Sequence, residues 1–330
     1  MTPTAVVILN WNGLHLLRRY LPDVVANSKE ATIVVADNAS TDGSLQWVAA
    51  AFPQVRTIVF DRNYGYAGGY NHAVEMLGDF PHLVLLNSDA RPAPDWLRPL
   101  DKALSDPDVA AVQPKILSDS HPERFEYAGA AGGFLDINGY PYCRGRIFDT
   151  VEEDRGQYDI PGEIFWASGA ALAIKRTDYL DAGGLDENFF AHMEEIDLCW
   201  RLRLMGKKIL YAPQSTVYHL GGASLDASSP RKTYLNFRNN LLMLHKNLPA
   251  GSATKRLLMR RRLLDTLAWA RFAVTGRFGH AAAIVRAHRH FATMRTNYRQ
   301  HPYSNLLATP STVNILKEYY IKRHKTFSEL

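Results

Sequence analysis

The chain has 330 residues, of which 46% are hydrophobic and 22% are charged, a composition that supports a large core and excludes global disorder. Its two cysteines, Cys143 and Cys199, lie far apart in sequence, which excludes a disulfide framework or a CxxC metal site and suits a reducing compartment. The N-terminus lacks basic residues before its short apolar run, and no uncharged apolar stretch reaches about 18 residues. We therefore expect neither a signal peptide nor a membrane-spanning helix.

The net charge of +5 conceals an uneven distribution along the chain. Residues 231–330 contain 19 Lys plus Arg against 3 Asp plus Glu, a charge of +16, and residues 1–230 carry a charge of −11. A division of this size indicates two tasks within one chain. We interpret it as an acidic body and a basic extension that meets an anionic surface.

The first half of the chain alternates short β-branched apolar runs with helical segments. Continuous apolar runs are typical of buried parallel strands, and their alternation with helices predicts a doubly wound parallel sheet with right-handed crossovers. The expected strands are 5–10, 32–37, 55–60, 82–87 and 109–116, and the expected helices are 14–27, 43–51, 66–78 and 95–105.

The second half of the chain is more varied. Residues 118–163 are rich in Gly, Pro, Tyr and Asp, which is typical of a binding loop or an excursion with its own hairpins. From residue 231 onward the pattern is helical. The other expected features are a strand at 164–176, a helix at 177–182, a helix that starts within 189–202 and ends at Gly206, two strands at 207–213 and 215–220, and later breaks at 249–251, 275–276 and Pro302.

Short polar side chains follow four successive predicted strands. Ligands of open parallel sheets bind beyond the carboxyl ends of the strands, so these residues are expected to form one site. Each segment by itself also fits an Asx-turn, a helix N-cap or a glycine turn. The acids and flexible glycines suit a nucleotide with a diphosphate, and the lack of GxGxxG and GxxxxGK[ST] disfavours dinucleotide and P-loop sites. The candidates are Asn10, Asp37, Asn38, Asp42, Asn63, Gly65, Asn71, Asn87, Ser88 and Asp89.

Seven motifs occur in a set order between about residues 4 and 240: VVILNWNG, VVADNASTDGS, RNYGYAGGYN, LLNSDARP, FWASGAALAIKR, GGLDENFFAHMEEIDLCWRLRLMGKKILYAP and TVYHLGGAS. Together they resemble glycosyltransferase family 2, the inverting enzymes of the GT-A fold, and especially its rhamnosyltransferase-like members. The resemblance implies an α/β fold with a Rossmann-like, mostly parallel sheet flanked by helices. We expect a nucleotide-sugar-binding half at 1–117, an acceptor and catalytic half at 118–230, and a basic helical extension at 231–330.

The resemblance also implies individual roles. Asp37 contacts the nucleobase of a sugar nucleotide, and Asn10 lines that pocket. Asp89 holds a divalent ion, Mg²⁺ or Mn²⁺, that bridges the diphosphate, and His219 occupies the position of a second metal ligand in some relatives. The residues expected to border the donor sugar and the acceptor are Trp166, Ser168 and Gly169.

This sequence departs from the family pattern at two motifs. The usual Asp-x-Asp of the metal site is Asn87-Ser88-Asp89 here, so one carboxylate is missing. The usual Glu-Asp pair is Glu194-Glu195 here, which leaves open which acid is the base. Transfer with inversion needs a carboxylate that removes the proton of the acceptor hydroxyl, and partial burial helps by raising its pKa.

The acidic segment 189–202 supplies three carboxylates beside Phe189, Phe190 and Trp200. Acids in a first helical turn also stabilise the helix dipole, so one of them is explained without catalysis. Three acids beside aromatic side chains exceed that need. We predict that Glu195 is the base, that Glu194 is the alternative base or orients it, and that Asp197 is mainly structural.

The basic segment 255–291 interleaves Arg with Leu, Trp, Phe and Ala, which on a helix predicts a cationic face and an apolar face. We interpret it as a membrane-surface segment. Nucleic-acid binding is the rival interpretation, disfavoured by the apolar content, and two more are that the segment packs on the body or pairs in a homodimer. Tyr234, Arg238 and Asn239 are expected to help close over the diphosphate.

The sequence thus predicts a metal-assisted inverting glycosyltransferase of cell-surface polysaccharide synthesis. The expected donor is dTDP-rhamnose, with a UDP-sugar (galactofuranose or a hexose) as the alternative. The expected acceptor is a hydroxyl of a glycan or a polyprenyl-linked glycan, and the expected location is the cytoplasm, peripheral at the inner face of the membrane. A non-catalytic nucleotide-sugar or carbohydrate-binding protein is the rival hypothesis from another functional class.

Overall fold

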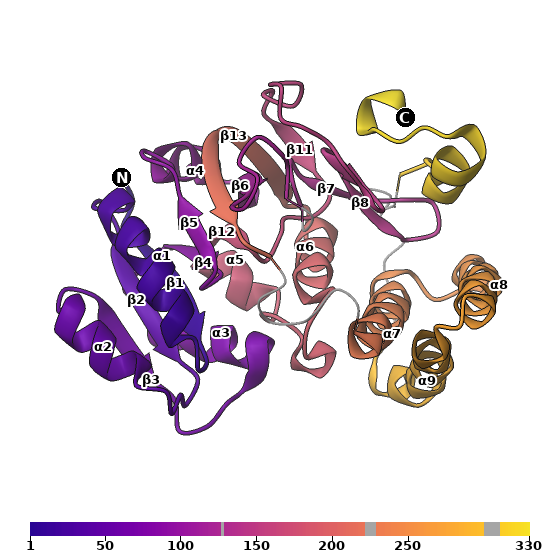
Figure 1. The fold of residues 1–330 in the computed structure, drawn as a ribbon, viewed down its shortest axis with the longest axis horizontal. Helices are drawn as coiled ribbons and strands as arrows, with labels where there is room; N and C mark the ends of the chain where they lie inside the picture. The colour runs from indigo at the N-terminus through magenta and orange to yellow at the C-terminus, as the bar shows by residue number, and fades with distance from the viewer. Residues whose placement is uncertain (127–128, 222–228, 300–310) are drawn as a thin grey trace.

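The computed structural model describes residues 1–126, 129–221, 229–299 and 311–330 (Figure 1). Its centre is a nine-stranded sheet in the order β11-β13-β6-β12-β4-β1-β2-β3, with β5 paired to β13. The parallel strands are β1 (Thr4–Asn10), β2 (Thr32–Asp37), β3 (Arg56–Val59), β4 (His82–Leu86), β6 (Val109–Ser118) and β13 (Lys208–His219). The strands antiparallel to their neighbours are β5 (Ala90–Pro92), β11 (Gly162–Ile164) and β12 (Ala171–Lys175).

The expected mostly parallel α/β sheet is therefore confirmed, and two elements of its second half differ from the prediction. The strand expected at 164–176 is two strands, β11 and β12, separated by the segment from Phe165 to Ala170. The two strands expected at 207–213 and 215–220 are one strand, β13, whose pairing with β6 shifts register between Ala212 and Thr216. Pro213 lies within this shift and has no N–H to donate, so a bulge accommodates it and the strand continues.

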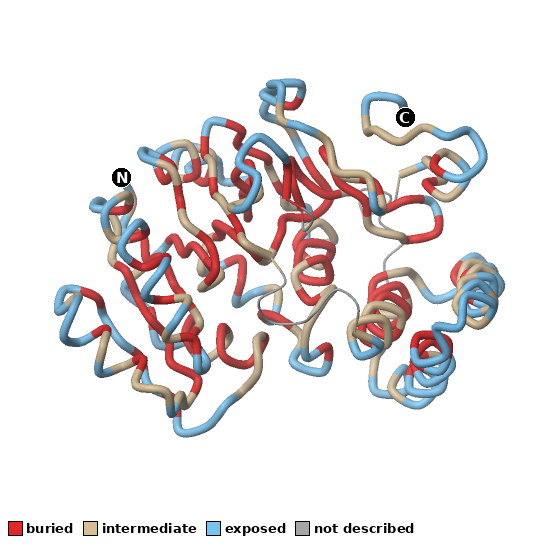
Figure 2. The backbone as a smooth tube through the Cα atoms, viewed as in Figure 1, coloured by how far each residue is buried: buried red, intermediate tan, exposed pale blue. Residues whose placement is uncertain are grey.

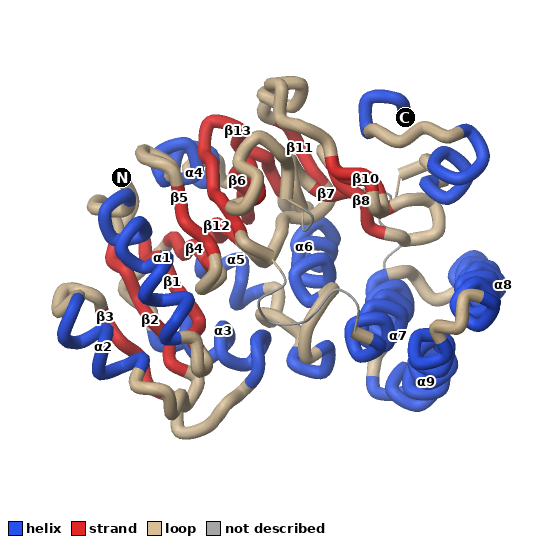
Figure 3. The backbone as a smooth tube through the Cα atoms, in the orientation of Figure 1, coloured by secondary structure: helices blue, strands red, loops and turns tan. Residues whose placement is uncertain are grey.

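Apolar cores cover both faces of the sheet. The strands of the sheet are largely buried (Figure 2), and helices lie around them (Figure 3). Neighbouring residues of β1 alternate between the cores, since Ala5 and Val7 belong to one and Val6 and Ile8 to the other. This double burial explains why the strands have continuous apolar sequences. The helices on one face are α1 (Leu14–Asn27), α2 (Ser44–Ala51) and α4 (Leu97–Leu104), and those on the other are α3 (Gly65–Met76), α5 (Arg176–Asp181) and α6 (Glu194–Leu204).

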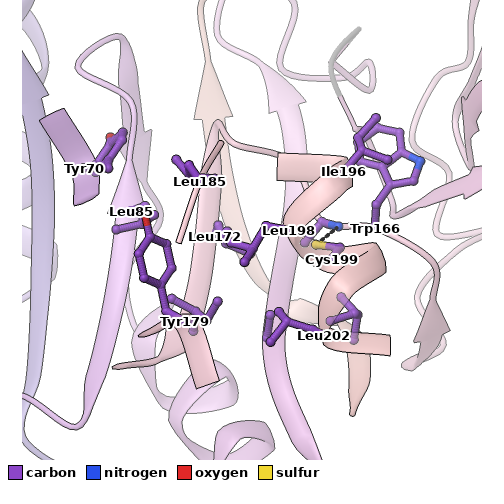
Figure 4. Close-up of a cluster of buried hydrophobic side chains, with 14 of the residues drawn as sticks. Tyr70, Leu85, Trp166, Leu172, Tyr179, Leu185, Ile196, Leu198, Cys199 and Leu202 are labelled. Atoms are coloured by element: carbon purple, nitrogen blue, oxygen red, sulfur yellow. Dashed lines mark hydrogen bonds between the residues drawn. The ribbon is translucent and has the colours of Figure 1, made fainter. Parts of the chain in front are cut away.

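Helix α6 is fixed to the sheet by its buried side. The cluster in Figure 4 places Leu198, Cys199 and Leu202 of this helix with Leu172 of β12. The backbone N–H of Ala167 donates to Cys199 Sγ at 3.4 Å, so this cysteine is part of the core. The first turn of α6 is thereby held beside the segment that precedes β12.

Residues 118–163 form hairpins, as expected. The strands β7 (Gly133–Leu135), β8 (Pro141–Cys143), β9 (Arg146–Ile147) and β10 (Thr150–Val151) make a second, antiparallel sheet. The end of the chain packs on this sheet, where Tyr142 and Ile147 contact Ile315 and Tyr319. Short helical turns are η1 (Glu187–Phe189), η2 (Arg295–Asn297), η4 (Lys317–Lys322) and η5 (Phe327–Glu329).

Three long helices, α7 (Pro230–Asn247), α8 (Ser252–Val274) and α9 (Phe278–Met294), lie to one side of the sheet (Figure 1). The predicted breaks at 249–251 and 275–276 separate them, and the break predicted at Pro302 lies outside the described residues. No helix in the part of the chain that the structure describes has the length and apolar character needed to cross a bilayer.

Helix α8 differs from the expected division into a cationic and an apolar face. Its inner side buries Arg261 and Asp265, whose carboxylate accepts a hydrogen bond from the Tyr140 hydroxyl at 3.1 Å and pairs with His288 at 3.0 Å. Arg261 lies 3.7 Å from the centre of the Tyr140 ring. These contacts offset the cost of burying the charges. Apolar side chains are instead exposed on the opposite side of the helix, at Met259, Leu263, Leu267 and Val274.

Candidate active site

The carboxyl ends of β1 and β2 bring Asn10 and Asp37 together. Both side chains are fully buried, and Asn10 Nδ2 donates to Asp37 Oδ1 at 2.8 Å. The other carboxylate oxygen of Asp37 accepts from the backbone N–H of Ser40 at 2.9 Å. Asn10 Oδ1 has no hydrogen-bond partner among the described residues although it is buried. An unsatisfied buried acceptor at a strand end is a feature that a bound ligand or ordered water would explain.

The loops after β2 and β3 are joined by Asn38. Its Nδ2 donates to the Gly65 carbonyl at 2.9 Å, and its Oδ1 accepts from Tyr64 N–H at 2.8 Å. Asn63 Oδ1 accepts from Gly65 N–H at 2.8 Å, and Gly65 has a φ of +73°, which glycine adopts without strain. These candidate residues set the shape of the loop that starts α3.

Two candidates have structural tasks that the nucleotide prediction did not include. Asp42 accepts from the backbone N–H groups of Leu14 at 2.8 Å and Ser44 at 3.1 Å, so one carboxylate caps the starts of both α1 and α2. Asn71 Oδ1 accepts from the Tyr179 hydroxyl at 2.6 Å and Leu185 N–H at 2.9 Å. These contacts give Asp42 and Asn71 structural tasks, and their nucleotide contacts stay predictions.

Asp89 and His219 are brought together by the pairing of β5 with β13, in which His219 lies opposite Ala90. Asp89 Oδ1 is 3.0 Å from His219 Nε2, and Asn87 Nδ2 is 3.3 Å from the same nitrogen. Ser88 is half-buried between these two candidates. Burial disfavours the imidazolium, yet hydrogen bonds to Asp89 and to Glu126, 3.5 Å from Nδ1, raise the pKa of His219 to about 10.

The donor set fits a divalent ion that shares its coordination with a substrate. Within residues 1–126, 129–221, 229–299 and 311–330, no three His, Cys, Asp or Glu side chains are arranged to hold a metal ion. Asp89 and His219 supply one carboxylate and one imidazole, and a bound ion would replace the proton that they share. Mg²⁺ characteristically takes few protein ligands and completes its shell with substrate phosphates and water. Glu126 would orient the imidazole, a role that its irregular sequence setting did not indicate.

The segment before β12 links the carboxyl end of β4 to helix α6. The Ala170 carbonyl accepts from Asn87 N–H at 3.0 Å, and the Gly169 carbonyl accepts from the Tyr66 hydroxyl at 2.9 Å. A side chain at residue 169 would start 2.7 Å from the Tyr66 oxygen and 3.8 Å from Glu195 Cβ, so it would require the Tyr66 hydroxyl to shift. The acid motif thus lies beside the strand end that carries Asn87. The sequence did not indicate a role for Tyr66, because the glycines of its motif explained the motif by themselves.

Trp166 and Ser168 are buried, and their polar atoms contact the protein. Trp166 Nε1 donates to the Phe134 carbonyl at 3.0 Å. Ser168 N–H donates to Gln113 Oε1 at 2.8 Å, and its hydroxyl accepts from Ala170 N–H at 3.2 Å. Both residues therefore shape the segment that carries Gly169, which is the member of the predicted trio nearest to the acid motif.

Glu194 and Glu195 begin helix α6, and their environments differ. Glu194 is 5% exposed, whereas Glu195 is half-buried. Burial raises the pKa of both carboxyl groups, and the charge of Glu195 raises that of Glu194 further. Each has one buried oxygen without a hydrogen-bond partner among the described residues. A half-buried carboxylate with a raised pKa and a free oxygen has the properties of a general base.

Asp197 is fully buried and engaged by protein cations. Its carboxylate accepts from Arg201 Nε at 2.9 Å, Lys246 Nζ at 2.9 Å and Asn247 Nδ2 at 2.7 Å. These contacts support the structural role predicted for it. The predicted closure of Tyr234, Arg238 and Asn239 over a diphosphate is not what the structure shows, because Arg238 and Asn239 are buried against the backbone that precedes α6.

A family model for glycosyl transferase family 2 matches residues 5–167, which contain the four strand ends described above. These residues form a glycosyl transferase family 2 domain. Over 227 residues this glycosyltransferase is 28% identical to the N-acetylglucosaminyl-diphospho-decaprenol L-rhamnosyltransferase of Mycobacterium tuberculosis, covering 63% of the chain and 72% of that relative. It is 23% identical over 250 residues to the low-salt glycan biosynthesis hexosyltransferase Agl10 of Haloferax volcanii, covering 72% of the chain and 74% of the relative.

Solved structures show the same GT-A fold. The mannosyltransferase PcManGT of Pyrobaculum calidifontis, in complex with GDP-Man and Mn²⁺, has a TM-score of 0.53 at 18% identity over 90% of this glycosyltransferase and 85% of that chain. GalNAc-T7 with UDP, GalNAc and Mn²⁺ has a TM-score of 0.57 at 18% identity over 74% of this chain and 48% of its own. At these identities the likeness shows the fold alone.

The double cap of Asp42 gives a test that separates stability from ligand binding. Replacing Asp42 with Ala removes acceptors for two helix N-termini and should lower the free energy of unfolding by about 1–2 kcal/mol. Urea unfolding of the variant measures this change, with the exposed Asp79→Ala as the control. Unchanged stability together with lost nucleotide binding would return Asp42 to the ligand site.

Proposed function

We propose that the protein transfers a sugar, with inversion, from a nucleoside-diphosphate sugar to a hydroxyl group of a glycan or polyprenyl-linked acceptor. The observation that carries the proposal is the position of Glu195. It is half-buried with a raised pKa and lies beside Gly169, whose neighbour Ala170 is bonded to the loop of Asp89. These contacts support a base and a metal site at the same carboxyl edge of the sheet.

In this proposal the nucleotide lies over the ends of β1 and β2, next to Asn10 and Asp37. The diphosphate lies toward Asp89 and His219, and a bound Mg²⁺ or Mn²⁺ would supply stabilisation of the negative charge that develops on the leaving group. Glu195 takes the proton of the acceptor hydroxyl while the oxygen of that hydroxyl attacks the anomeric carbon of the donor sugar. The apolar surroundings that raise the pKa of Glu195 also strengthen it as a base.

For the donor sugar we propose dTDP-rhamnose. Support comes from the similarity to the mycobacterial L-rhamnosyltransferase, which covers 63% of this chain. A UDP-sugar, galactofuranose or a hexose, is the second candidate, favoured by the GalNAc-T7 structure with UDP. The raised pKa of Glu195 favours catalysis over a non-catalytic binding protein, because a general base works best when its pKa lies near the working pH.

We also propose the division into a donor half at 1–117, an acceptor half at 118–230 and an extension at 231–330. In the extension, Met259, Leu263, Leu267 and Val274 recur at helical spacing and are 65%, 66%, 68% and 88% exposed. Basic residues flank this apolar stripe, namely Lys255, Arg256, Arg260, Arg262 and Arg271, all exposed.

An apolar stripe between cationic margins suits the surface of an anionic bilayer, where the apolar side chains enter the interface and the cations meet lipid phosphates. The partner proposed for α8 is therefore an anionic membrane, at the inner face, where a lipid-linked acceptor would be available. A homodimer through the same stripe is the competing outcome.

The assignment of the base is tested by Glu195→Gln, with Glu194→Gln beside it and the exposed Glu163→Gln as the control. Loss of the base should lower kcat by about 10²–10⁴-fold and leave the KM for the donor nearly unchanged, because the carboxylate acts on the acceptor. A donor panel with and without Mg²⁺ or Mn²⁺ provides the assay. Full activity in E195Q with loss in E194Q would move the base to Glu194, and full activity in both would refute the mechanism.

The membrane proposal is tested by L263E/L267E, with Ile160→Glu, 76% exposed on a distant loop, as the matched control. The double variant should lose at least tenfold in affinity for phosphatidylglycerol-containing vesicles in co-sedimentation, and the control should bind as the unaltered protein does. Wild-type binding that is equal on neutral and anionic vesicles, or a dimer that L263E/L267E dissociates, would contradict an anionic membrane as the partner.

A further inference from the structure

The backbone that leads into the acid motif is strained. Phe190, His192 and Met193 have φ values of +67°, +70° and +75°, a region that side chains other than glycine rarely adopt. Each such residue costs conformational free energy and persists only where surrounding contacts hold it. Met193 is the residue immediately before Glu194, so the strained segment determines the direction in which α6 and its two glutamates begin.

Asn239 of α7 donates hydrogen bonds to the carbonyl groups of this segment. Its side-chain Nδ2 lies 2.9 Å from the Phe189 oxygen, 2.9 Å from the Ala191 oxygen and 2.8 Å from the His192 oxygen. The side chain is fully buried. The two N–H groups of one amide are thus shared among three carbonyl acceptors, those of Phe189 and Ala191 on either side of Phe190 and that of His192.

Arg238 completes the contact. Its Nη2 donates to the carbonyls of Asn188 at 3.0 Å and Phe189 at 2.9 Å. Its Nε donates to Asn239 Oδ1 at 2.8 Å, which fixes the orientation of the Asn239 amide so that its N–H groups face the strained segment. The guanidinium therefore acts on the segment both directly and through its neighbour.

Helix α7 also contacts α6 on the far side of Glu195. Lys246 and Asn247 bond Asp197, and Lys246 pairs in addition with Asp186 at 2.8 Å. Helix α7 therefore bonds α6 both before and after Glu195. The acid motif and the first helix of the extension are packed together, although they are about 40 residues apart in sequence.

We propose that Arg238 and Asn239 are positioning residues that keep the strained segment 188–193 in the conformation that directs Glu195 at the acceptor. The proposal rests on the proposed function only in taking Glu195 as the base. The competing explanation is that the pair merely contributes packing and stability, as any buried polar residue would.

The neighbouring Asn240 provides a matched control for this distinction. It is on the same helix and 2% exposed, but its Nδ2 donates to the Gly139 carbonyl at 2.8 Å, away from the acid motif. Asn239→Leu should lower kcat at least tenfold, with the donor KM within about twofold of the unaltered protein. Asn240→Leu should lower the melting temperature similarly and keep kcat within about twofold.

Rescue separates positioning from stability. Phe190, at 47% exposure, is the most exposed of the three residues with positive φ, so replacing it with Gly removes less burial than at His192 or Met193 while making the positive φ easy to adopt. N239L/F190G should recover at least threefold of the kcat lost in N239L. Equal loss of kcat in N239L and N240L, or no recovery in the double variant, would overturn the proposal.

Hydrogen exchange keeps this test independent of the identity of the base. The amides of residues 189–194 should exchange at least tenfold faster in N239L than in N240L, whether or not Glu195 is catalytic. If the segment exchanges faster in N239L while E195Q retains its activity, the positioning by Arg238 and Asn239 is supported and Glu195 is not the base. Unchanged exchange in N239L would refute the positioning role and leave the assignment of Glu195 to its own test.

Discussion

The antiparallel pairing of β12 with β4 is the constraint on which the site depends. It places Ala171 opposite Leu86, so the segment before β12 meets the loop after β4, and the Ala170 carbonyl bonds Asn87. The pairing of β5 with β13 then carries Asp89 to His219. Because the apolar side of helix α6 packs on β12, Glu195 lies at the same edge of the sheet. Backbone pairing thus brings four distant parts of the sequence to this edge.

Burial gives the charged residues of this edge their chemical character. Asp197 and Asp42 are satisfied by several donors and stabilise the fold, whereas Glu194 and Glu195 retain buried oxygens without partners among the described residues. A carboxylate of the second kind is costly in a folded protein and is typical of a catalytic or binding site. In helix α6, Glu194 and Glu195 therefore differ from the nearby Asp197, and the difference lies in the hydrogen-bond donors that surround each carboxylate.

Much of the fold could be predicted from the sequence, because β1, β2 and β4 are buried on both faces and their apolar runs are continuous. The ends of these strands also pointed to Asn10, Asp37 and Asp89. The sequence could not tell whether a polar side chain at a strand end binds a ligand or caps a helix. Asp42 and Asn71 show this, since their donors come from helix starts and from a segment more than 100 residues away.

The sequence also could not predict contacts between residues that are far apart along the chain. Arg238 and Asn239 were expected to close over a diphosphate, and only the packing of α7 against the segment before α6 reveals that they bond its carbonyls. The sequence likewise did not show that the apolar stripe of α8 faces outward. Arg261 and Asp265 are buried on the inner side of the helix and disturb the simple amphipathic pattern. Side-chain direction in the extension depends on tertiary partners that no local pattern encodes.

The central claim is that one edge of the sheet holds both the activated sugar and the base. The most direct measurement is a crystal structure of the protein with an intact nucleotide sugar and Mn²⁺, in which anomalous scattering locates the ion. The account predicts the Mn²⁺ peak next to Asp89, with the anomeric carbon between the diphosphate and the Glu195 carboxylate. A nucleotide bound away from Asn10 and Asp37, or a sugar whose anomeric carbon faces away from both Glu194 and Glu195, would contradict it.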